Sequence, residues 1–174
     1  PENVSYKLLK NGNSACVTCS SNAAGCGGVS AGTCNAGFGT TDNGITCTAC
    51  PANVSYKLTA DNTKCVECSP YASGCGGTTA GTCDKGYGTT DNGITCAVCP
   101  ANTSYKITAG NSDCVKCSPH ATGCGGEYSG SCNAGYSSKN DGVTCSPCSA
   151  NVSFKESAGN HNCSPCVEHT VSCG

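Results

Sequence analysis

A short alternation of apolar and polar residues recurs along the chain. In residues 53–58 (NVSYKL), Val, Tyr and Leu occupy every second position. A period of two predicts a half-buried strand, with Asn53 on its solvent side and Tyr56 toward the interior. No stretch carries a useful helical period, so we expect short strands and turns with little or no helix. Closely similar segments begin at Asn3, Asn102 and Asn151.

Turn signals separate these segments. The sequence Asp-Asn-Gly at 42–44 and 91–93 predicts tight turns, because Asn and Gly tolerate positive φ. The sequence Gly-Cys-Gly-Gly at 25–28, 74–77 and 123–126 indicates irregular backbone. An aromatic residue follows a glycine later in each segment, and we expect it to pair with the strand aromatic in a small core. These later aromatic residues are Phe38, Tyr87 and Tyr136.

The cysteines show that the chain is a tandem repeat. They recur with a period of 49 residues, six to a period, which is a strong repeat signal. We therefore predict cysteine-rich repeats at 1–50, 51–99 and 100–148, and a partial repeat at 149–174. Pro1 corresponds to Pro51 and Pro100, each of which follows a cysteine. We expect the chain to be part of a longer array whose first cysteine lies upstream.

Composition explains why cysteine dominates. Leu, Ile, Val and Phe supply 19 of 174 residues, too few for a conventional core, whereas cysteine supplies 21. This composition predicts a disulfide scaffold made in an oxidising compartment. The nine lysines are scattered and the net charge is −2, which argues against nucleic acid as a partner. No apolar run is long enough to span a membrane.

Two alternatives for the paired C-x2-C motifs carry less weight. Cys47, Cys50, Cys65 and Cys68 have a spacing close to that of a zinc ribbon. A zinc site would leave two cysteines per repeat without a role and would imply a reducing compartment. A redox C-x2-C is disfavoured too, because no βαβ pattern surrounds the pairs. We therefore expect structural disulfides, no metal and no cofactor.

One N-glycosylation sequon occurs at the same phase of every repeat. Four sequons in register in a disulfide-type chain predict N-linked glycans on a regular row of acceptors. The alternative is an unmodified polar strand face. The acceptor residues are Asn3, Asn53, Asn102 and Asn151.

Candidate catalytic groups are not retained between repeats. His120 and His169 share a phase, but Tyr71 and Asn22 occupy that phase elsewhere, and His161 corresponds to Ser112. Groups that a repeat exchanges freely do not form a repeated acid, base or metal ligand, so we expect no enzyme activity. The lysine that follows each strand aromatic is constant, and we expect it to keep that face soluble.

The cysteine order resembles the cysteine-rich modules of tumour-necrosis-factor receptors and related growth-factor-receptor and furin-like repeats. The motif is Cys50-Pro51, a tyrosine five residues later, then Cys65-x2-Cys68 and three more cysteines. A competing EGF-like arrangement would join Cys83 to Cys96. The receptor resemblance implies the pairs Cys50–Cys65, Cys68–Cys83, Cys75–Cys96, Cys99–Cys114, Cys117–Cys132, Cys124–Cys145, Cys148–Cys163, Cys19–Cys34 and Cys26–Cys47.

In overall style the chain resembles the surface immobilisation antigens of ciliates, cysteine-rich repeat proteins displayed through a lipid anchor. The resemblance and the near-identical repeats predict a non-enzymatic structural glycoprotein, an elongated rod in a cell-surface coat or extracellular filament. Its partners would be its glycans and neighbouring copies or repeats, with a membrane reached only through an anchor outside this sequence. The alternative is a ligand-binding or adhesive receptor ectodomain.

Overall fold

The computed structural model describes residues 1–10, 13–167 and 173, and these residues form short strands and turns without a helix. This agrees with the small disulfide-rich repeats expected from the sequence. The strands are β1 (Ser5–Lys10), β2 (Asn13–Thr18), β3 (Ala23–Ala24), β4 (Thr33–Cys34), β5 (Phe38–Gly39), β6 (Thr48–Ala49), β7 (Ser55–Tyr56), β8 (Val66–Glu67), β9 (Ala72–Ser73), β10 (Thr82–Cys83), β11 (Tyr87–Gly88), β12 (Ala97–Val98), β13 (Ser104–Tyr105), β14 (Val115–Lys116), β15 (Ala121–Thr122), β16 (Ser131–Cys132), β17 (Tyr136–Ser138), β18 (Cys145–Pro147), β19 (Ser153–Phe154) and β20 (Ser164–Pro165).

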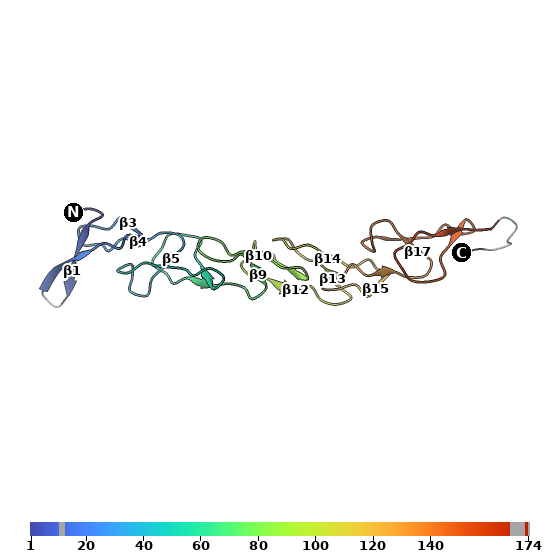
Figure 1. The fold of residues 1–174 in the computed structure, drawn as a ribbon, viewed down its shortest axis with the longest axis horizontal. Coiled ribbons are helices and arrows are strands. Elements are labelled where there is room, and N and C mark those ends of the chain that lie inside the picture. The colour runs from blue at the N-terminus through green and yellow to red at the C-terminus, as the bar shows by residue number, and fades with distance from the viewer. Residues whose placement is uncertain (11–12, 168–172, 174) are drawn as a thin grey trace. The chain divides into compact units, whose positions relative to one another are not determined.

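The strands pair two by two rather than forming an extended sheet. Each two-stranded ladder is antiparallel where its register is defined, as in β7 and β8, where Tyr56 lies opposite Val66. The longest ladder joins β1 to β2 over six residues each, in the blue hairpin at the N-terminal end of Figure 1. An isolated two-stranded hairpin is marginal in water, so another interaction has to hold these pairs.

Disulfides supply that interaction through three short rings per repeat. The ring partners are separated by 7, 13 and 15 residues, as in Cys68–Cys75, Cys83–Cys96 and Cys99–Cys114. In the chain-entropy view, closing rings of this size stabilises the fold by about 2–3 kcal/mol each. The other bonds are Cys19–Cys26, Cys34–Cys47, Cys50–Cys65, Cys117–Cys124, Cys132–Cys145, Cys148–Cys163 and Cys166–Cys173.

This pairing corrects part of the connectivity implied by the receptor resemblance. The pairs across the 15-residue loops form as the resemblance implied: Cys50–Cys65, Cys99–Cys114 and Cys148–Cys163. The crossed pairs are wrong: Cys68–Cys83, Cys75–Cys96, Cys117–Cys132, Cys124–Cys145, Cys19–Cys34 and Cys26–Cys47 do not form. The competing EGF-like link, Cys83 to Cys96, is the one present.

Local turns explain why the rings close in succession along the chain. A turn in which the amide of Ala72 donates to the carbonyl of Ser69 reverses the chain between Cys68 and Cys75. This brings the two Cα atoms to 5.9 Å, within the range that a disulfide needs. Between Cys83 and Cys96, the predicted Asp-Asn-Gly turn has the same effect, and the Cα atoms lie 5.5 Å apart.

In the first three repeats the core combines cystine with one buried tyrosine, which is Tyr6, Tyr56 or Tyr105. Tyr56, Cys75 and Ala80 form a buried cluster, and the partly buried Cys68 packs against it. The expected second aromatic does not join this core, because Phe38 and its counterparts Tyr87 and Tyr136 are only half-buried. The disulfide sulfurs take its place, and the most deeply buried of them include Cys34, Cys83 and Cys132.

The chain divides into two compact parts, residues 1–82 and 83–174. The predicted repeat boundaries stay predictions, but the covalent links across them are clear. Cys50–Cys65, Cys99–Cys114 and Cys148–Cys163 each join the end of one predicted repeat to the start of the next. Successive repeats therefore share a ring rather than only a linker.

Thiol counting tests the ring assignment. Among the cysteines, the structure leaves only the exposed Cys16 unpaired. Replacing the bonded pair Cys83 and Cys96 by serine should leave that count unchanged and lower the free energy of unfolding by about 2–3 kcal/mol. Replacing Cys68 and Cys83 together should free Cys75 and Cys96 and add two titratable thiols. Two extra thiols in the first variant, or none in the second, would contradict the assignment.

Candidate functional site

The sequon asparagines lie in a turn, which corrects the strand predicted for residues 53–58. Asn53 has a φ of 59°, and the amides of Val54 and Ser55 both donate to the carbonyl of Pro51. Only Ser55–Tyr56 is a strand, β7. The alternation fails as a result: Val54 is 58% exposed, whereas Ser55 is 7% exposed. The left-handed backbone conformation of Asn53 changes the direction of the chain, so the two-residue alternation of a strand does not begin at Asn53.

A glycine from the Gly-Cys-Gly-Gly segment makes room for this turn. The amide of Asn53 donates to the carbonyl of Cys75 at 2.6 Å. A Cβ added to Gly76 would lie 2.6 Å from the Cα of Ala52, so a larger residue would displace the turn. Gly125 stands in the same relation to Ala101, at 2.5 Å. The sequon turn is therefore held in a fixed conformation in both repeats.

All four sequon asparagines are exposed and share this conformation. Each has a φ of 59°, and each leaves its side chain in solvent, where a glycan fits. Asn is also one of the few residues other than Gly that tolerate the left-handed region, so the turn alone favours Asn. Glycosylation of Asn3, Asn53, Asn102 and Asn151 stays a prediction, and the geometry is compatible with it.

The constant lysine is exposed in the first repeat, as Lys7, but it is buried in the next three repeats, contrary to the expected role in solubility. Lys57 is 3% exposed, and its Nζ donates to the carbonyl of Phe38 at 3.0 Å. Phe38 belongs to the preceding repeat. The same Nζ donates to the carbonyl of Asp61 and lies 3.0 Å from the Asp61 carboxylate. The lysine therefore joins a backbone carbonyl of one repeat to a loop of the next.

The next two repeats form the same link. Lys106 donates to the carbonyls of Tyr87, at 2.9 Å, and Gly110. Lys155 donates to the equivalent carbonyls of Tyr136 and Gly159, and also to Cys132. Burial lowers the pKa of both amines, because it disfavours their charged form. These lysines form one class of buried side chain that binds carbonyl oxygens across a repeat boundary.

A constant asparagine makes a second link that the sequence analysis missed. Asn62 accepts from the amide of Cys34 at 3.0 Å and donates to the carbonyl of Gly32 at 2.9 Å. Asn160 binds Cys132 and Gly130 in the same way. The sequence carried a signal for this link, because asparagine recurs at this phase of all four repeats, as Asn13, Asn62, Asn111 and Asn160.

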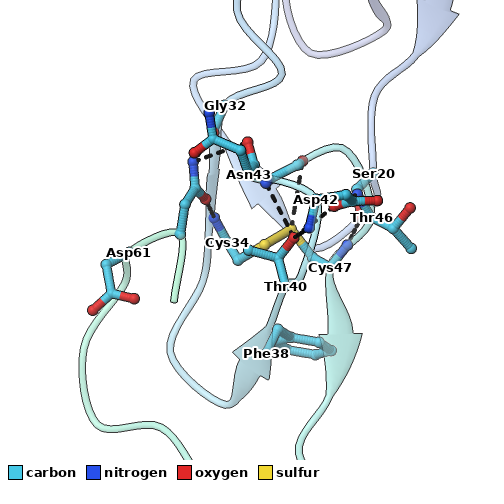
Figure 2. Close-up of a disulfide and its surroundings, with 12 residues drawn as sticks. Ser20, Gly32, Cys34, Phe38, Thr40, Asp42, Asn43, Thr46, Cys47 and Asp61 are labelled. Atoms are coloured by element: carbon cyan, nitrogen blue, oxygen red, sulfur yellow. Dashed lines mark hydrogen bonds between the residues drawn. A yellow bond between two sulfur atoms is a disulfide. The ribbon is translucent and has the colours of Figure 1, made fainter. Parts of the chain in front are cut away.

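The Asp-Asn-Gly turns have the expected conformation and surround a disulfide. Asn43 and Gly44 have φ values of 58° and 89°. Figure 2 shows Thr40 and Asp42 beside the Cys34–Cys47 bond. The Thr40 hydroxyl donates to the Asp42 carboxylate at 2.6 Å and accepts from the amide of Gly44 at 3.1 Å. The carboxylate therefore stabilises the turn. Its hydrogen bonds, above all the one from Thr40, lower the pKa of Asp42.

The following repeats show which parts of this turn matter. Thr89 and Asp91 reproduce the hydroxyl–carboxylate bond at 2.6 Å, and the pKa of Asp91 is lowered by the same cause. In the third repeat, Asn140 accepts from the amide of Thr144 at 3.1 Å without a carboxylate. A neutral amide suffices there, so the feature common to the three turns is hydrogen bonding to the backbone.

The remaining candidate ligands and histidines are also placed. Cys47, Cys50, Cys65 and Cys68 belong to three different disulfides, so the zinc-like spacing does not gather four thiolates. His120 stacks on Tyr136 with the ring centres 3.9 Å apart. His161 is exposed, and His169 lies outside the described residues. Within the described ranges, no group of three His, Cys, Asp or Glu is arranged to hold a metal.

Comparison with known proteins gives no relative. No family model matches the sequence, and neither a curated protein nor a solved structure with significant similarity is found. In the part of the chain that the structure covers, no helix has the length and apolar character to cross a membrane.

Replacing a buried lysine tests the link between repeats. In Lys106→Met, the carbonyls of Tyr87 and Gly110 lose their buried donor. We expect the free energy of unfolding to fall by about 1–3 kcal/mol, the cost of leaving buried polar groups unpaired. Denaturant unfolding of the oxidised protein measures it, with Lys116→Met at an exposed lysine as the control. Equal stability of the two variants would refute the link.

The carboxylate in the second turn gives a pH prediction. Because the folded pKa of Asp91 is lowered, its contribution to stability is present above the unfolded pKa and is lost as the pH falls through the folded pKa. Carboxyl NMR titration should place this pKa below its ordinary value, and Thr89→Val should raise it. Thr89→Ser keeps the hydroxyl, as Ser138 does in the third repeat, and should leave it low. An unchanged pKa in Thr89→Val would contradict this account.

Proposed function

We propose that this chain is a non-enzymatic structural glycoprotein of the extracellular space, in which tandem repeats build a rod for a cell-surface coat or filament. The observation that carries the proposal is the recurring junction between successive repeats. Each described junction combines a shared disulfide ring with a buried lysine that binds carbonyls of the preceding repeat, as in Cys50–Cys65 with Lys57. A repeated junction of this kind suits a protein that transmits or resists force along its length.

The compartment follows from the same bonds. Ten disulfides in 174 residues indicate an oxidising environment, extracellular or secretory. Disulfide-rich repeats of this size are typical of extracellular proteins that are not enzymes. Four exposed sequon asparagines at one phase support a regular row of glycans, which suits a covering layer. Display at the cell surface is the finer part of the proposal.

Shortening the chain by one repeat tests the rod. Deletion of residues 51–99 joins Cys50 to Pro100 and keeps the partner of Cys50 available as Cys114. We expect X-ray scattering of the oxidised, secreted protein to show a maximum dimension reduced in proportion to the repeats removed. Electron microscopy of the full chain should show lateral or end-to-end packing. An unchanged maximum dimension would refute the rod, and unpacked single particles that bind a soluble ligand tightly would favour a receptor ectodomain.

A further inference from the structure

A groove lined from equivalent positions occurs at two successive repeat junctions. The first has a volume of about 310 Å³ and is lined by Gly39, Thr41, Thr46, Pro51 and Ser55, among others. The second, of about 360 Å³, lies 49 residues further along the chain. Its corresponding lining residues are Gly88, Thr90, Thr95, Pro100 and Ser104. Both volumes reach the lower range of small-molecule sites.

A glycine at the edge of each groove allows two backbone segments to pack closely. A Cβ added to Gly39 would lie 2.5 Å from the amide nitrogen of Cys65, and one on Gly88 would lie 2.6 Å from that of Cys114. Neither glycine has a positive φ, so the need is for space rather than for an unusual backbone conformation. The glycines therefore allow β5 and β11 to approach the backbone of Cys65 and Cys114, which line the same grooves.

The lining favours an uncharged ligand with hydroxyl groups. One lining position is Lys64 in the first groove and Asp113 in the second. A charged ligand that was attracted by this residue in one groove would be repelled by it in the other. The constant lining consists of threonine, serine, proline, glycine and a disulfide-bonded cysteine. Threonine presents both a methyl group and a hydroxyl, and the two together suit a sugar ring, which has an apolar face and polar edges.

The sequon lies directly beside the groove. Pro51 and Ser55, two residues before and after Asn53, both line it, and Ser55 is itself the sequon serine. Two peptide units span at most about 7.6 Å between Cα atoms, so Asn53 lies no further than that from either lining residue. The Asn53 side chain is exposed, so a glycan attached to it starts within reach of the groove. The relation is the same for Asn102.

We propose that these grooves hold the first sugar residues of the N-glycans on Asn53 and Asn102. The inference rests on the glycosylation in the proposed function and gives it a defined place on the protein. The glycan core packs on threonine methyl groups and hydrogen-bonds to their hydroxyls, which orients the sugar relative to the junction. Each repeat then presents its glycan in one fixed direction.

The third junction provides a control within the same chain. There the residues that correspond to Gly39, Thr41 and Pro51 are Ser137, Lys139 and Ser149. The serine places a side chain where the first two grooves have none, and the lysine adds a charge. Asn151 keeps the same φ of 59° and the same exposure as the other acceptors. Its glycan therefore has an equivalent attachment, but the residues beside it differ from the lining of the first two grooves.

Release of glycans from the native protein tests the proposal. The full chain, secreted from eukaryotic cells, is treated with peptide-N-glycosidase, and mass spectrometry follows the conversion of each asparagine to aspartate. We expect release from Asn53 and Asn102 to be about two- to tenfold slower than from Asn151, the range expected when one net hydrogen bond must first break. After reduction and denaturation, the three sites should react at similar rates.

A variant separates the groove from other causes of protection. Thr41→Lys introduces the residue of the third junction at an exposed position and should speed release from Asn53 alone. Ala60→Lys, exposed and outside the lining, should leave that rate unchanged. Equal native rates at the three sites, or no effect of Thr41→Lys, would overturn the groove assignment while glycosylation stood. Unmodified Asn53 and Asn102 would overturn both.

Discussion

Local disulfide closure is the constraint on which this protein depends. With 19 Leu, Ile, Val and Phe residues in the chain, apolar burial alone cannot order it. The rings of 7, 13 and 15 residues compensate for the missing burial because they lower the conformational entropy of the unfolded chain. Their sulfurs then fill the core positions that aliphatic side chains occupy in conventional domains. The two-residue strands follow from this, because a ladder so short is stable only where a nearby ring fixes its ends.

The polar junction is the second consequence of a core without aliphatic residues. A repeat of this kind has little apolar surface to offer its neighbour, so the contact is made by polar groups with fixed partners. Lys57 and Asn62 form hydrogen bonds to backbone groups of the preceding repeat. Carbonyl oxygens are present in any sequence, so this junction tolerates changes in the surrounding side chains, such as Phe38 to Tyr87.

Much of this architecture could be predicted from the sequence, and the limits have physical reasons. The period of the cysteines and the positive φ of Asn43 and Gly44 are local properties, so pattern and turn chemistry identified them. The pairing of Cys68 and Cys75 could not be chosen, because six cysteines allow fifteen pairings. The burial of Lys57 could not be predicted, because it depends on carbonyl groups that only the folded backbone brings together.

The closeness of ring partners along the chain also bears on how such a protein is made and how it evolves. Every bond in the described structure closes within 15 residues, so each can form soon after its second cysteine enters an oxidising lumen. Synthesis and oxidation can then advance together from one end, with few wrong partners in reach. Unequal recombination in steps of 49 codons would lengthen or shorten the gene without breaking a bond in the repeats that remain.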